Sequence, residues 1–106
     1  MSTAKSQVPA YSITEVEVVD ADGFKRYREL AQAAVAQYGG RFLVQGAKPI
    51  IVEGDWPPEQ NVVVIEFPSM DQLKAWYDSA EYRIARELAR KALRRRLLFV
   101  EGVSGS

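Results

Sequence analysis

The stretch Val62-Val63-Val64-Ile65-Glu66-Phe67-Pro68 decides the fold of this chain. Four β-branched residues run together, and Glu66 alone interrupts the apolar character before Pro68 stops it. A strand with one face in water alternates apolar and polar residues, so this continuous run predicts a strand that is covered on both faces. Helices can cover one of these faces, and something else must cover the other.

The segments around this stretch predict strands and helices that alternate. The expected strands are 11–19, 41–45, 50–53, 62–67 and 97–100, and the expected helices are 21–38, one capped by Ser69, and one starting near Asp78-Ser79. The side chains on the inward face of the last helix should be those of Ile84, Ala85, Leu88, Ala89, Ala92 and Leu93. The two halves look like a repeated strand–helix–strand unit, which predicts an α+β fold.

The predicted architecture is a ferredoxin-like βαββαβ antiparallel sheet with helices on one face. Strands 62–67 and 97–100 are apolar on both sides and need a cover on the open face, which no remaining segment can supply. A second copy, packed sheet to sheet about a two-fold axis, would cover it, so we predict an obligate homodimer. Residues 10–103 should form a single domain, with 1–9 as a disordered N-terminal tail and 104–106 as a C-terminal tail.

Composition excludes several classes of function. The 106 residues carry 14 basic and 14 acidic side chains, so no net charge draws the chain to nucleic acid or to an anionic membrane. The chain has no cysteine and no histidine. This removes disulfides, thiolate catalysis, Ser-His-Asp chemistry and the commonest transition-metal ligands.

The sequence also predicts a cytoplasmic protein without a membrane partner. Residues 1–10 lack the apolar core of a secretory signal. No apolar run approaches the roughly 18 residues that a membrane span needs.

Two charged residues are candidates for ligand contacts. Arg41 follows the Gly39-Gly40 turn at a sheet end, where it could clamp a carboxylate or phosphate. Glu66 is the one charge in the most apolar strand, where burial would raise its pKa unless a cation offsets that cost, and it is the weak candidate for a catalytic base. The plainer interpretation is that Arg41 forms a structural pair with Glu66 or another acid, and that Glu66 is a structural carboxylate whose hydrogen bonds are satisfied.

Three aromatic residues are candidates for pocket walls. Trp76 and Tyr77 follow each other on a helix that faces the sheet, and each offers a large apolar surface with one donor. Tyr11 is a further ligand-binding candidate, and Tyr27 a weaker one. Aromatic residues at helical spacing are also typical of plain core.

A basic run extends through the C-terminal part of the chain. Its members are Arg83, Arg86, Arg90, Lys91, Arg94, Arg95 and Arg96. Helical spacing predicts a solvated face here, and the strand at 62–65 lacks the aromatics that stack on RNA bases, so we expect no nucleic-acid partner. No acidic spacing resembles a metal site and no glycine-rich phosphate loop is present, so we expect no metal and no cofactor.

Several short motifs resemble those of one family. They are Gly39-Gly40-Arg41-Phe42-Leu43, Glu53-Gly54-Asp55-Trp56, Glu66-Phe67-Pro68, Ala75-Trp76-Tyr77-Asp78-Ser79 and Val100-Glu101-Gly102-Val103. Over about residues 10 to 103 the chain resembles the domain of unknown function 1330 family, except that Ala21 and Ala80 stand where the family often has proline, at helix starts. The resemblance implies a dimeric α+β barrel, similar in fold to cofactor-independent monooxygenases and muconolactone-isomerase-like enzymes, and no established activity.

Two functions fit these observations. The first is a homodimer that binds a small organic ligand, anionic or neutral, between sheet and helices, with or without cofactor-free acid–base chemistry. The second is a non-catalytic sensor or accessory homodimer without pocket chemistry. The sequence leaves open whether the protein is an enzyme.

Overall fold

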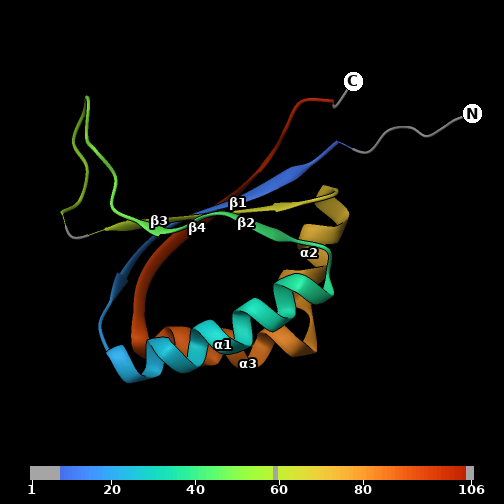
Figure 1. The fold of residues 1–106 in the computed structure, drawn as a ribbon, viewed down its shortest axis with the longest axis horizontal. Coiled ribbons are helices and arrows are strands. Elements are labelled where there is room, and N and C mark those ends of the chain that lie inside the picture. The colour runs from blue at the N-terminus through green and yellow to red at the C-terminus, as the bar shows by residue number, and fades with distance from the viewer. Residues whose placement is uncertain (1–7, 59, 105–106) are drawn as a thin grey trace, which may run out of the picture.

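The computed structural model describes residues 8–58 and 60–104. In chain order the elements are β1 (Ala10–Val18), α1 (Ala21–Gln37), β2 (Arg41–Ala47), β3 (Asn61–Phe67), α2 (Met70–Asp78), α3 (Ala80–Ala92) and β4 (Leu93–Glu101). The helices lie on one face of the sheet, and α1 and α3 pack against each other beneath it (Figure 1). Of the tails predicted at 1–9 and 104–106, residues 1–7 and 105–106 lie outside the described residues.

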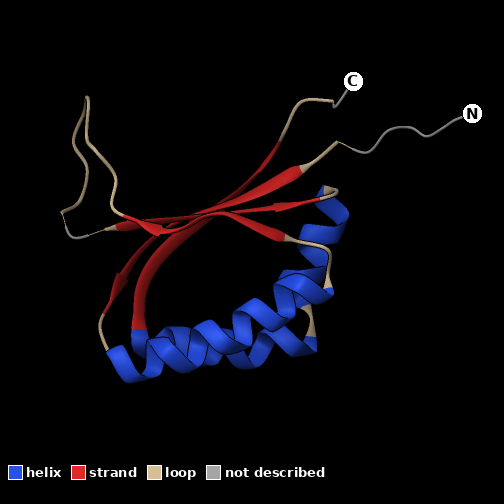
Figure 2. Cartoon of the chain, viewed as in Figure 1, coloured by secondary structure: helices blue, strands red, loops and turns tan. Residues whose placement is uncertain are grey.

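The described strands form one antiparallel sheet in the order β2-β3-β1-β4. The stretch 62–67 is therefore an inner strand of the sheet, as predicted. Two layers, one of strands and one of helices, make up the molecule (Figure 2). The predicted α+β fold with a ferredoxin-like antiparallel sheet is confirmed.

The core lies between the sheet and the helices, where the predicted apolar stripe of α1 meets α2 and α3. Trp76 is its centre, with ring centroids 5.1 Å from Phe67 and 4.2 Å from Tyr82. Trp76, Phe67 and Tyr82 are all buried. Because α2 and α3 meet at Ser79, the aromatic rings of both helices converge on the same side of the sheet.

The predicted strand at 50–53 is wrong. Residues 48–58 and 60, the described part of the connection from β2 to β3, form an irregular loop that projects on the side of the sheet opposite the helices (Figure 1). Ile50 and Val52 are each 89% exposed. Pro49 and Gly54 limit this apolar segment to four residues, and no described strand lies beside it to accept its backbone hydrogen bonds.

The C-terminal strand is longer than predicted. β4 begins at Leu93 and pairs with β1 from Val18↔Leu93 to Ala10↔Glu101, so Leu93 belongs to a strand and not to the inward face of α3. Ile84, predicted to point inward, is 59% exposed. The residue that α3 buries in its first turn is Tyr82.

The sheet face opposite the helices is uncovered in the single chain. Leu98 is 55% exposed and Val100 40% exposed on this face of β4. Ile13 lies directly across from Leu98 on β1, and Val64 lies across from Ile13 on β3. This apolar surface, together with Tyr11 and Glu66, is called the open face below.

Candidate functional site

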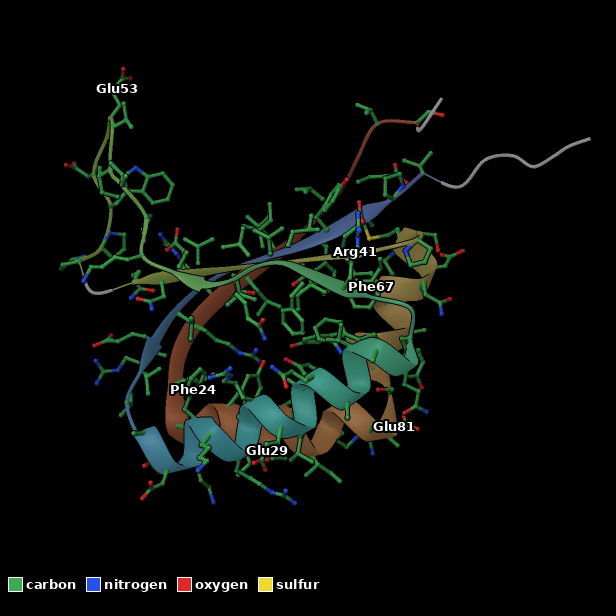
Figure 3. The ribbon with its side chains drawn as sticks, in the orientation of Figure 1. Phe24, Glu29, Arg41, Glu53, Phe67 and Glu81 are labelled. Atoms are coloured by element: carbon green, nitrogen blue, oxygen red, sulfur yellow. The ribbon has the colours of Figure 1, made fainter. Side chains whose placement is uncertain are left out.

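A cavity of about 290 Å³ lies between the sheet and the helices. Apolar side chains from β1, β2, β3, β4 and α1 form its walls, among them Val16, Phe24, Phe42, Val63, Ile65 and Leu97. In Figure 3, Phe24 points from α1 toward the sheet, whereas Glu29 on the same helix points away. The exposed side chains of Arg28, Gln32 and Gln45 lie where the cavity opens to solvent.

Arg95 is a polar feature of this cavity. Its Nη1 donates to the hydroxyl of Tyr27 at 2.9 Å and to that of Tyr82 at 3.0 Å. The two hydroxyls are 2.8 Å apart and share a hydrogen bond. The guanidinium also lies 5.4 Å from the centre of the Tyr27 ring. All three residues line the cavity, and we call them the Arg95 cluster.

Burial shapes the protonation of this cluster. Desolvation, with the nearby Tyr27 second, raises the pKa of Tyr82 well above its usual range, so this hydroxyl stays protonated. Desolvation alone would lower the pKa of Arg95, but Tyr27 and Tyr82 outweigh it and raise that pKa above its usual value. The cluster therefore holds the protonated hydroxyl of Tyr82 beside the permanent cation of Arg95.

Three of the predicted site residues meet on the open face. Arg41 Nε donates to Glu66 Oε1 at 2.7 Å, and the Tyr11 hydroxyl donates to Glu66 Oε2 at 3.2 Å. Figure 3 shows Arg41 on the side of the sheet away from the helices. None of the three lines the cavity.

The Arg41–Glu66 pair is the structural pairing that the sequence offered as the plainer interpretation. The hydrogen bond from Arg41 holds the pKa of Glu66 below its ordinary value, against an opposing effect of desolvation. Burial, and next the hydrogen bond to Glu66, raise the pKa of Tyr11. A shallow hollow adjoins Arg41 and Glu66, bordered by Pro9, Gly39 and Pro68.

The other two predicted residues lie on the helix side. Trp76 is 1% exposed and lines the cavity. Tyr77 packs edge-on against Phe99, with ring centroids 5.6 Å apart, and Arg86 lies 4.3 Å above its ring. The structure thus divides the predicted site between the two faces of the sheet, and the ligand-binding role of these five residues stays a prediction.

Arg95 and Tyr82 line the site although the sequence does not predict them as site residues. Arg95 was assigned to a solvated helix face because it sits within a basic run. The signal that places it correctly is the alternation of Leu93, Arg95, Leu97 and Phe99, which has the period of a strand. Tyr82, in the first turn of α3, carried no comparable signal.

Within 8–58 and 60–104, no three acidic residues lie close enough together to hold a metal ion. In the same part of the chain, no helix has the length and apolar character that a membrane crossing requires.

A four-stranded antiparallel sheet with helices on one face and a cavity beneath it defines a ferredoxin-like α+β protein. More particularly, a family model described as a domain of unknown function (DUF1330) matches residues 9–103, and the chain belongs to this family. Among curated proteins, none matches the chain.

Solved structures share the fold at low sequence identity. A protein of unknown function from Rhodopseudomonas palustris is 17% identical, with a TM-score of 0.76 over 93% of this chain and 85% of that one. A cofactor-independent oxygenase from Streptomyces nogalater is 8% identical, with a TM-score of 0.62 over 92% and 96%. A dimeric protein of unknown function from Bacteroides fragilis is 15% identical, with a TM-score of 0.60 over 91% and 98%. These similarities establish the fold alone.

Proposed function

We propose that this protein binds a small organic molecule in the cavity between the sheet and the helices. The observation that carries the proposal is the cavity itself, at about 290 Å³, with mostly apolar walls and a few convergent polar groups. Ligand sites typically have this character, and their volumes begin at about 300 Å³. A tightly packed interior at this place would have favoured the sensor or accessory protein without a pocket.

Cofactor-free acid–base chemistry is the catalytic extension of this proposal. Tyr82 and Tyr27 could donate hydrogen bonds to a ligand oxygen, and the raised pKa of Tyr82 keeps its hydroxyl protonated for that role. Glu66 stays a prediction for the base, and its lowered pKa does not favour it. A cofactor-independent oxygenase with this fold supports the extension by analogy only.

A thermal-shift screen against a panel of small metabolites tests the binding proposal. A ligand at about 100 times its Kd stabilises the protein by roughly 2.7 kcal/mol, which is several degrees for a domain of this size. Gln32→Trp places a large ring where the cavity opens and should abolish the shift. Ala33→Trp adds the same ring one residue further along α1, at an exposed position outside the cavity, and should preserve it. Shifts that are equal in both variants, or absent from wild type for every compound, would contradict the proposal.

We also propose that the open face is covered by a second copy of the chain. Ile13, Val64 and Leu98 form an apolar surface on it, and the loop at 48–58 projects on the same side with Ile50 and Val52 exposed (Figure 1). Exposed apolar patches of this kind mark interaction sites. A neighbour with this fold is described as dimeric, which supports the same assembly here. The cytoplasmic location stays a prediction.

Light scattering at micromolar concentration tests the dimer. Wild type should give the mass of two chains. Leu98→Glu puts a charge on the open face and should give monomers, because a buried unpaired carboxylate is costly. Ile84→Glu makes the same change at an equally exposed position on α3 and should leave the mass unchanged. A monomeric wild type would overturn the proposal.

A further inference from the structure

Within residues 8–58 and 60–104, Arg95 differs from its two neighbours in having no acidic partner. Side chains alternate along β4, so Arg94 and Arg96 point to the open face, where they meet Glu17 at 3.9 Å and Glu15 at 2.8 Å. Arg95 points to the helices, and its cross-strand partner on β1 is Val16. Among the described residues, no carboxylate lies within 4.0 Å of its guanidinium nitrogens.

The hydrogen bonds of the Arg95 cluster leave donors in excess. Three bonds join Nη1 and the hydroxyls of Tyr27 and Tyr82. Whichever hydroxyl donates to the other, the second hydroxyl keeps a hydrogen without an acceptor in the cluster. The guanidinium keeps Nε and Nη2 as well, and an arginine side chain has no acceptor of its own. The cluster thus offers hydrogen-bond donors to a group in the cavity that accepts them.

The charge on the cavity wall is positive, like that of Arg95 itself. Of the described residues that line it, the charged ones are Arg95 inside and Arg28 at the exposed opening, and both are cations. A desolvated cation is costly unless an anion compensates it. Two lining residues, Ser12 and Trp76, also hold buried polar atoms (Ser12 Oγ and Trp76 Nε1) that have no hydrogen-bond partner within the described part of the chain.

We propose that the Arg95 cluster binds the carboxylate of a small monocarboxylic acid whose apolar body fills the rest of the cavity. This inference rests on the proposed binding function and names its ligand class. The planar guanidinium presents N–H groups in a fork that matches the two oxygens of a carboxylate. A single buried arginine compensates one negative charge. The walls of Val63, Ile65 and Leu97 suit an aromatic or branched body.

The size of the cavity limits the ligand. A volume of about 290 Å³ equals about ten water volumes, so an acid of roughly ten non-hydrogen atoms fits. Phenylacetate has this size and a single negative charge. Phenylacetamide has the same shape without the charge, and phenyl phosphate carries more charge on a similar body.

Calorimetric titration of the full chain with these three probes tests the proposal. Wild type should bind phenylacetate and should bind phenylacetamide at least about 10-fold more weakly, since a hydrogen bond to a charged group is worth roughly 10- to 150-fold in affinity. Arg95→Met should weaken phenylacetate binding by a similar factor and leave phenylacetamide unchanged. Arg96→Met, one residue along β4 on the open face, is the matched control and should bind like wild type.

The outcomes separate this inference from the binding function on which it rests. Equal affinity for the acid and the amide, with both lost in Gln32→Trp, would overturn the carboxylate assignment and leave the binding site in place. Tighter binding of phenyl phosphate than of phenylacetate would also overturn it, in favour of a phosphate. If no probe or metabolite binds to wild type, both proposals fail. Should Arg95→Met not fold, Arg95→Lys keeps the charge without the fork and should still weaken the acid alone.

Discussion

Arg41 Nε and Glu66 Oε1 lie 2.7 Å apart across the β2–β3 pair, on the face of the sheet opposite the helices. The Tyr11 hydroxyl donates to the other oxygen of Glu66. Each oxygen of Glu66 accepts a hydrogen bond, which favours the ionised carboxylate. Glu66 lies on β3, between Tyr11 on β1 and Arg41 on β2. Tyr11, Arg41 and Glu66 therefore connect three strands at one end of the sheet.

Glu66→Gln should destabilise the protein in a way that depends on pH. The folded-state pKa of Glu66 is lowered from 4.5, so its contribution is complete above pH 4.5 and disappears as the pH falls through the folded-state value. Because Arg41 is 73% exposed, we expect a loss of under about 1 kcal/mol at pH 7. Urea unfolding at pH 7 and pH 3 measures the difference. Glu29→Gln, in an exposed pair with Arg26, is the control, and an equal loss from Glu66→Gln at both pH values would contradict the prediction.

Trp76→Ala should be among the most destabilising substitutions in the chain. The indole packs between Phe67 and Tyr82 and is 1% exposed, so its removal enlarges an existing cavity. We expect a loss of about 3–5 kcal/mol in the free energy of unfolding, measured in urea. Ile84→Ala, at an exposed position on α3, should cost less than about 0.5 kcal/mol. Losses of similar size in the two variants would show that the indole is not a core residue.

Ser79 joins α2 to α3 through one hydroxyl. Its Oγ donates to the carbonyl of Trp76 at 2.7 Å and accepts from the N–H of Tyr82 at 3.0 Å. Ser79→Ala leaves both backbone groups without this partner and should cost about 1–2 kcal/mol in the free energy of unfolding. Ser69→Ala removes the simpler, more exposed cap of α2 and should cost less. The prediction fails if chemical denaturation finds Ser69→Ala the more destabilising of the two.

The fold was predictable from sequence because its signals are long and periodic. The continuous apolar run at 62–67 placed the inner strand, and the stripe of α1 placed a helix against it. The segment 50–53 is equally apolar, yet it forms no strand, because pairing depends on a neighbouring strand that the sequence of the segment itself does not reveal. Whether an apolar segment is buried in a sheet therefore depends on the strands beside it as well as on its own residues.

The candidate site was less predictable for a related reason. Arg95 stands between Arg94 and Arg96, and all three carry the same charge. Only the register of β4 against β1 turns the middle one into the cavity while its neighbours meet Glu15 and Glu17. A shift of one residue would exchange their faces, so the site depends on register and not on residue type.

Gly40 should tolerate no side chain, because it packs against the core. A Cβ at this position would lie 2.6 Å from Cε2 of Phe67 and 2.9 Å from Cγ1 of Val35. We expect Gly40→Ala to cost about 1–3 kcal/mol in the free energy of unfolding, as overpacking does. Gly46→Ala is the control: its φ of 89° strains any side chain, but no atom lies within 4 Å of the added Cβ.

A double-mutant cycle with Phe67→Leu separates the two causes. Replacing the ring should relieve the clash at Gly40, so the combined loss should fall short of the sum by about 0.5–3 kcal/mol. The losses from Gly46→Ala and Phe67→Leu should instead add, since strain in the backbone of β2 does not depend on the ring. Additive losses for Gly40→Ala and Phe67→Leu would mean that the backbone at Gly40, and not its contact with Phe67, requires glycine there.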